Sequence, residues 1–214
     1  MTVETKQNKK EVTREKNQQL ILAAAEKIFA QLGFEGASMG MIAKEAGVAK
    51  ANVHYYFNSK NALYEIVLEN IVRSWNLGLE DVSVEDDPAV VLYNYIKNKI
   101  ILSIEKPVQS RLFAIEMIHG APFLQTYIRN ESRPWFREKH QLLQAWMDAE
   151  KMDQVDPNHL LFTIWSTTQY YADFQAEALL LLNKHEYEES DVKAITQSTA
   201  QIILKGVGLS IPQL

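Results

Sequence analysis

Apolar residues recur along most of the chain at spacings of three and four, which is the pattern of helices that bury one face. The first such stripe comprises Leu20, Ile21, Ala24, Ala25, Ile28, Phe29 and Leu32. Gly33 is placed to end this helix, and the following pattern predicts short helices over 39–46 and 50–57. A longer helix is predicted to begin after Ser59.

The same periodicity continues after an acidic stretch at residues 80–88. It predicts helices over 89–105, 108–119, 122–150, 157–182 and 191–206, with Pro134 breaking or restarting the third of them. Asp87-Pro88 and Asp156-Pro157 are typical helix starts, with a capping carboxylate followed by proline in the first turn. No run alternates with period two, so the chain is predicted to be all-α.

Residues 36–40, GASMG, fit the G-x-S-x-G pattern that surrounds the serine nucleophile of α/β hydrolases. That interpretation requires a strand immediately before the serine. Here a helix and a glycine-containing turn precede Ser38, and a short helix follows it. Ser38 is therefore predicted to cap that helix, and a helical hydrolase using Ser38 is a distant alternative.

The composition favours a globular protein of a reducing compartment, because 47% of the 214 residues are hydrophobic and there is no cysteine. We expect a cytoplasmic location, since no signal peptide is apparent and Asp173 and Glu177 interrupt the most apolar late segment. The five histidines lack metal-ligand spacing, and no HExxH, GxGxxG or GxxxxGK[ST] motif occurs. We therefore expect no catalytic site, metal or cofactor.

The net charge of −5 is unevenly distributed. Residues 1–60 carry nine basic and six acidic side chains, whereas the remainder carries 13 basic and 21 acidic ones. A basic end on an acidic body is typical of a module that binds a polyanion such as DNA. Its first part, with Lys6, Lys9, Lys10, Arg14 and Lys16, is predicted to be either an arm on DNA or a solvated tail.

The ordered motifs in residues 29–63, FAQLGFEGASMGMIAKEAGVAKANVHYYFNSKNAL, resemble the N-terminal helix-turn-helix domain of TetR-family transcriptional regulators. Later segments, SRLFAIEMIHGAPFL and IWSTTQYYADF, are similar to the effector domain of pyrimidine-responsive repressors in this family. The resemblance implies a basic arm and three-helix DNA-binding domain over residues 1–62. A long helix would join it to an effector-binding and dimerisation domain over residues 63–214.

The second helix of a helix-turn-helix lies in the major groove with its N-terminal residues toward the base edges. By resemblance, base contacts are expected from Lys50, Ala51 and Asn52, and phosphate contacts from Tyr55, Tyr56 and Lys60. His54 is either a further phosphate contact or a packed or solvated side chain, and Phe57 is expected in the core. Ala49 stands where the family usually has Ser or Thr, so it cannot cap the helix through its side chain.

Aromatic and polar residues share the predicted inward faces of the C-terminal domain, as in small-molecule sites. The candidate ligand-binding residues are Trp75, Phe113, Phe123, Trp165, Thr168, Gln169 and Asp173. A glutamine amide matches the adjacent N–H and C=O groups of a pyrimidine such as uracil, and tryptophan can cover the ring. A lipophile such as a fatty acid or an aromatic compound is the alternative effector, and a satisfied polar core is the alternative without any ligand.

These features predict a homodimeric regulator, with repression as the expected sign, that binds double-stranded operator DNA and is released by a small molecule. Pairing is expected through helices 157–182 and 191–206, which carry apolar residues on more than one face. The residues expected to pair are Leu161, Ile164, Ala172, Leu179, Leu180, Ile195, Ile202 and Ile203.

Overall fold

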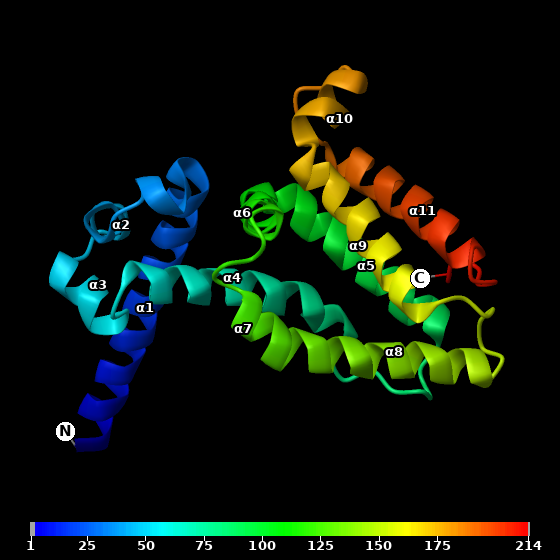
Figure 1. Cartoon of the computed structure of the whole chain (residues 1–214), viewed down its shortest axis with the longest axis horizontal. Coiled ribbons are helices and arrows are strands. Elements are labelled where there is room, and N and C mark those ends of the chain that lie inside the picture. Colours follow the sequence, from blue (N-terminus) through cyan, green and yellow to red (C-terminus); the bar gives the residue numbers. More distant parts are fainter. Residues whose placement is uncertain (1–2, 214) are drawn as a thin grey trace.

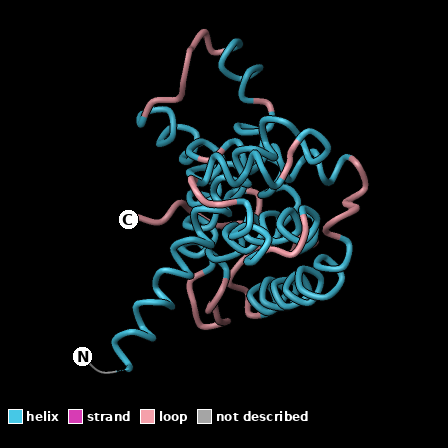
Figure 2. Tube along the Cα trace, turned by 90° about the vertical axis from the view of Figure 1, so that its left-hand side faces the viewer, coloured by secondary structure: helices cyan, strands magenta, loops and turns pink. Residues whose placement is uncertain are grey.

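The computed structural model describes residues 3–213, with side chains described from residue 13 onward. All regular secondary structure in this range is helical, which confirms the predicted fold class (Figure 2). The elements are α1 (Val3–Gly36), α2 (Met39–Ala46), α3 (Lys50–Tyr56), α4 (Lys60–Asn76), η1 (Leu77–Leu79), α5 (Pro88–Glu105), α6 (Pro107–Ile118), α7 (Gln125–Tyr127), η2 (Ile128–Ser132), α8 (Arg133–Asp148), α9 (Pro157–Asp173), α10 (Gln175–Leu181) and α11 (Glu189–Lys205).

The first helices form a small head at one end of the molecule, where α2 and α3 pack beside α1 and the start of α4 (Figure 1). Fully buried Phe29, Ile42 and Val53 are part of its core. Ser38 Oγ accepts a hydrogen bond from Met41 N at 3.3 Å, so its predicted role as a helix cap is confirmed. Gly47 adopts φ 67° between α2 and α3, which makes the tight turn possible.

The basic leader is helical from Val3 and continuous with α1, and its contact with DNA stays a prediction. Arg14 and Lys16 are exposed, whereas the side chains of Lys6, Lys9 and Lys10 lie outside the described residues. Gly33 has a non-helical backbone (φ 71°, ψ 174°), so the first stretch of helix ends there as predicted, and α1 continues to Gly36 beyond this kink.

A second core holds the C-terminal domain together. Helices α5, α8, α9 and α11 surround buried Ile96, Ile100, Trp146 and Leu161. Ser59 Oγ caps α4 by accepting from Ala62 N at 3.1 Å, and α4 runs from the head to this domain (Figure 1). Helix α6 lies between the two cores and contacts α1, α4 and α9.

Two predicted helices are interrupted. The segment 122–150 contains α7, the π-helical η2 and then α8, and Pro134 falls in the first turn of α8 because it cannot donate a backbone hydrogen bond in a helix interior. The segment 157–182 breaks at Phe174, so α10 projects from the domain as a separate short helix (Figure 1). Within residues 3–213 no helix combines the length and apolarity needed to span a membrane.

Candidate DNA-binding helix and effector cavity

Helix α3 has one buried face and one exposed face. Val53 and, just beyond the helix, Phe57 are buried in the head, as expected for Phe57. The predicted DNA-binding residues Lys50, Ala51, Asn52, His54 and Tyr55 are all exposed, and Tyr55 keeps 73% of its surface accessible. Helix α3 therefore leaves a row of polar and small side chains free to contact another molecule.

The two remaining predicted DNA contacts have partners within the head. Tyr56 is half-buried, and its hydroxyl accepts from Asn17 Nδ2 at 3.5 Å. Lys60 Nζ donates to the carbonyls of Phe34 at 2.8 Å and Ala37 at 3.2 Å, and it lies 4.2 Å from the centroid of the Phe34 ring. Lys60 thus braces the connection between α1 and α2, and one of its three donors is left for a phosphate.

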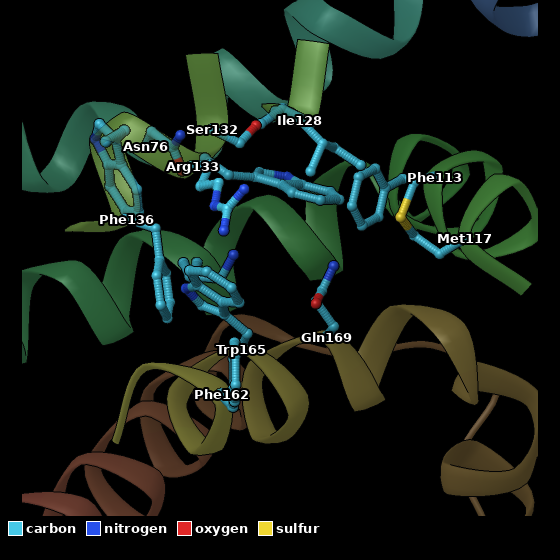
Figure 3. A pocket seen from close by; sticks show the side chains of 14 residues that line it. Asn76, Phe113, Met117, Ile128, Ser132, Arg133, Phe136, Phe162, Trp165 and Gln169 are labelled. Carbon is cyan, nitrogen blue, oxygen red and sulfur yellow. The ribbon is translucent and has the colours of Figure 1, made fainter. Parts of the chain in front are cut away.

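A cavity of about 360 Å³ lies in the C-terminal domain, and most of its lining residues are apolar, six of them aromatic (Figure 3). Helices α4, α5, α6, α8 and α9 and the π-helical η2 contribute to it. The lining residues are Val72, Trp75, Asn76, Lys99, Phe113, Met117, Ile128, Ser132, Arg133, Trp135, Phe136, Phe162, Trp165 and Gln169. Four of the seven predicted ligand-binding residues are therefore brought together: Trp75, Phe113, Trp165 and Gln169.

The other three are placed elsewhere. Phe123 packs against the rings of Phe34 and Tyr64, at centroid distances of 4.4 and 5.1 Å. Thr168 is fully buried and donates its hydroxyl to Ile164 O of its own helix at 2.7 Å. Asp173 accepts a hydrogen bond from Ser110 Oγ at 2.7 Å. Each of these side chains has a partner within the protein, and none of the three lines the cavity.

Lys99 is the cavity residue that the sequence reasoning missed most clearly. It is only 4% exposed, and its Nζ lies 4.8 Å from the ring centroid of Trp75. Burial lowers the pKa of Lys99 to about 7 because desolvation disfavours the ammonium, and the charge of Asp173 opposes this shift. A signal was present, since Lys99 follows Leu92 and Ile96 on the buried stripe of α5.

The π-helical η2 and the start of α8 bring further polar groups to the cavity. Ser132 Oγ and Trp135 Nε1 are buried and have no hydrogen-bond partner in the structure. The Arg133 guanidinium and the Gln169 amide both point toward the space between the aromatic rings (Figure 3). Buried polar atoms without a partner are unusual, and π-helical turns occur frequently at functional sites.

A helix-turn-helix head with an exposed second helix, joined to a helical domain with an internal cavity, defines a DNA-binding regulator with a site for a small molecule. The sequence matches the tetR family of bacterial regulatory proteins over residues 21–67 and the YcdC-like protein C-terminal region over residues 68–210. The chain belongs to the TetR family of transcriptional regulators.

Individual relatives agree with this assignment. The chain is 36% identical over 187 residues to the HTH-type transcriptional regulator RutR of Escherichia coli (strain K12), which covers 87% of this chain and 88% of the relative. The crystal structure of the putative regulator SCO4942 from Streptomyces coelicolor superposes with a TM-score of 0.69 and 25% identity, covering 91% and 99% of the two chains. FadR of Bacillus subtilis in complex with stearoyl-CoA shares the fold, with a TM-score of 0.64 and 18% identity over 88% and 98%.

The depressed pKa of Lys99 predicts a pH-dependent stability. Between about pH 7 and pH 10 the unfolded chain binds more protons at this position than the folded chain, so the cost of burying Lys99 is fully present below pH 7 and is relieved as pH rises. We expect Lys99→Met to raise the free energy of unfolding by roughly 3–5 kcal/mol more at pH 6 than at pH 10. Urea unfolding at both pH values measures this difference.

Lys97→Met is the matched control, because Lys97 lies on the exposed face of the same helix. Its effect on the free energy of unfolding should be small and the same at both pH values. An equal gain from Lys99→Met at pH 6 and pH 10 would show that the buried lysine keeps an ordinary pKa.

Proposed function

We propose that the protein is a homodimeric repressor that binds operator DNA through α3 and is released when a small planar effector occupies the cavity. The observation that carries this proposal is the position of α4. Its first turn, capped by Ser59, belongs to the head, while Val72, Trp75 and Asn76 near its other end line the cavity. A ligand that displaces Trp75 therefore acts on the helix that directly follows α3 in the head, which allows the two sites to be coupled.

The chemistry of the exposed face of α3 supports DNA recognition. Ala51 is small enough to let the backbone approach the bases, and Asn52 can pair bidentately with adenine. Lys50 can donate to guanine or phosphate, and His54 and the hydroxyl of Tyr55 can reach phosphates. All five residues are exposed on this short helix, as the major-groove arrangement requires.

The cavity supports a flat ring such as uracil or thymine as the effector. Trp165 Nε1 donates to the Tyr95 hydroxyl at 2.8 Å, which fixes the indole so that its face can cover a ring. Gln169 lies one helical turn further along α9 and lines the same cavity, where its amide can pair with adjacent N–H and C=O groups. The resemblance to pyrimidine-responsive repressors agrees with this arrangement.

A lipophilic effector is the alternative. The Bacillus subtilis FadR structure, which has the same fold, contains stearoyl-CoA. The cavity of about 360 Å³ is near the lower end of the roughly 300–1,000 Å³ that small-molecule sites occupy, and its wall contains Lys99, Arg133 and Gln169. These features favour a compact polar ring over a long acyl chain.

Exposed apolar residues on α9, α10 and α11 support pairing of two copies through these helices. Ile202 is 72% exposed and Leu180 is 80% exposed, whereas Leu161, Ile164, Ala172 and Ile203 are buried within the subunit. The dimer surface that we propose therefore includes fewer residues than the set predicted from the sequence. Ile202 borders a groove between α9 and α11 that small residues such as Thr163, Ser166 and Ser198 also line, which would let the helices of a second copy approach closely.

The DNA-binding assignment predicts that Asn52→Ala weakens binding to the preferred duplex by about 1–3 kcal/mol, because one bidentate base contact is lost. The duplex can be selected from a random double-stranded library with the wild-type protein, and affinities measured by fluorescence anisotropy at physiological salt. Tyr56→Phe, which removes only the hydroxyl, tests the phosphate contact of that residue. Asn94→Ala, an exposed asparagine on α5, is the control. Unchanged affinity of the Asn52→Ala, Tyr56→Phe double variant would refute this use of α3.

The effector assignment predicts that uracil or thymine releases the selected duplex from the wild-type protein. Gln169→Ala should raise the concentration needed for release by about tenfold, the effect of one lost hydrogen bond of about 1.4 kcal/mol, and leave the affinity for DNA without ligand nearly unchanged. Gln141→Ala, on the exposed side of α8, should behave as wild type. Release by a fatty acid and by no pyrimidine would replace this effector with the lipophilic alternative.

The dimer assignment predicts that the wild-type protein sediments as a dimer at micromolar concentration. Ile202→Asp should shift it toward monomer, because a charge would be buried without a partner at the centre of the proposed interface. Ile118→Asp is the matched control, since Ile118 is 81% exposed at the end of α6 and does not line the groove between α9 and α11. A wild-type monomer at that concentration is incompatible with the proposed pairing.

A further inference from the structure

Hydrogen-bond donors dominate the polar part of the cavity wall. Lys99 and Arg133 supply cations, whereas Asn76, Ser132 and Gln169 carry groups that both donate and accept. Tryptophan N–H, ammonium and guanidinium groups donate and cannot accept hydrogen bonds. Among the described residues that line the cavity there is no aspartate or glutamate. The formal charge of the cavity wall is therefore positive, because Lys99 and Arg133 have no carboxylate beside them in the lining.

The charge of Lys99 is incompletely balanced inside the protein. Asp173 is the carboxylate that acts on it, but within the described residues Lys99 forms no salt bridge. The Asp173 carboxylate accepts from Ser110 Oγ at 2.7 Å and is also attracted by Arg111, while burial raises its pKa. Because a buried charge is costly unless it is paired, Lys99 favours a second anion close to it.

We propose that the cavity selects an effector that is a planar anion, with its negative charge against Lys99 and Arg133 and its ring between the aromatic walls. This inference rests on the proposed function of the cavity as the effector site and narrows the chemical class that it takes. A flat ring that carries a carboxylate, or that has lost a ring N–H proton, fits both the cations and the aromatic walls of the cavity.

The aromatic walls explain why the anion is a flat ring. Trp75 and Phe113 meet edge to face at a centroid distance of 4.9 Å on one side of the cavity. Phe136 and Trp165, with centroids 5.8 Å apart, stand on another. A flexible aliphatic anion would satisfy the cations, but it would use the flat faces of these rings less fully than a stacked ring does.

Two pairs of probe ligands, each pair nearly equal in shape, distinguish the effect of the ligand's charge from the effect of its ring. Barbituric acid is an anion at neutral pH, whereas uracil is neutral, and benzoate and benzamide form the corresponding pair without a pyrimidine. We expect calorimetric titration of the wild-type protein at pH 7 to give at least tenfold tighter binding for the anion of each pair. Lys99→Met and Arg133→Gln should each reduce that ratio toward one. Lys97→Met and Arg137→Gln, which change exposed cations on the same helices, should not alter it.

The outcomes are distinct. Tighter binding of benzoate than of benzamide, with no binding of either pyrimidine, would support the planar anion and reject the pyrimidine effector. Binding of uracil and benzamide at least as tight as that of their anionic partners would overturn the anion preference and leave the pyrimidine effector standing. Failure of both anions to bind would also overturn it. The comparison of ligands on the wild-type protein needs no variant, so it holds even if a substitution impairs folding.

Discussion

The orientation of the DNA-binding head depends on a cluster of rings where the head meets the rest of the chain. The Phe34 ring lies 5.0 Å from that of Tyr64 and 4.4 Å from that of Phe123, so α1, α4 and the segment after α6 converge there. Glu116 Oε1 accepts a hydrogen bond from Phe123 N at 2.7 Å. Burial raises the pKa of Tyr64, and the charge of the neighbouring Glu116 raises it further. Close-packed interiors transmit displacements, so the head cannot turn without disturbing α6.

Helix α6 therefore belongs to both functional regions. Phe113 and Met117 line the cavity, whereas Gln109 Nε2 on the same helix donates to Glu26 of α1 at 2.8 Å. Together with α4, which carries Trp75, it gives the cavity two rigid connections to the head. A ligand that fits the cavity better in one position of α6 than in another would shift the population of head orientations, which is the physical requirement for coupling two sites.

What the sequence could predict was mostly local. The caps at Ser38 and Ser59, the turn at Gly47 and the stripes of the main helices are confirmed because each depends on neighbouring residues. The sequence could not show which inward-facing residues line the cavity and which belong to the core. Trp165 and Thr168 both face inward on α9, but Trp165 lines the cavity and Thr168 is fully buried, and this difference depends on tertiary packing. The cations on the wall depend on the same packing, although the position of Lys99 on an apolar stripe was a usable signal.

Two lysines differ in how the protein compensates the charge of the ammonium group. The ammonium of Lys60 has two backbone carbonyls as partners, so its charge stabilises the head in the absence of any ligand. The ammonium of Lys99 is buried against rings, and Asp173, the carboxylate that acts on it among the described residues, also accepts a hydrogen bond from Ser110. Its desolvation cost remains in the ligand-free protein, and an anion in the cavity would offset it. This incomplete pairing of Lys99 is the physical basis of the anion preference that we propose for the cavity.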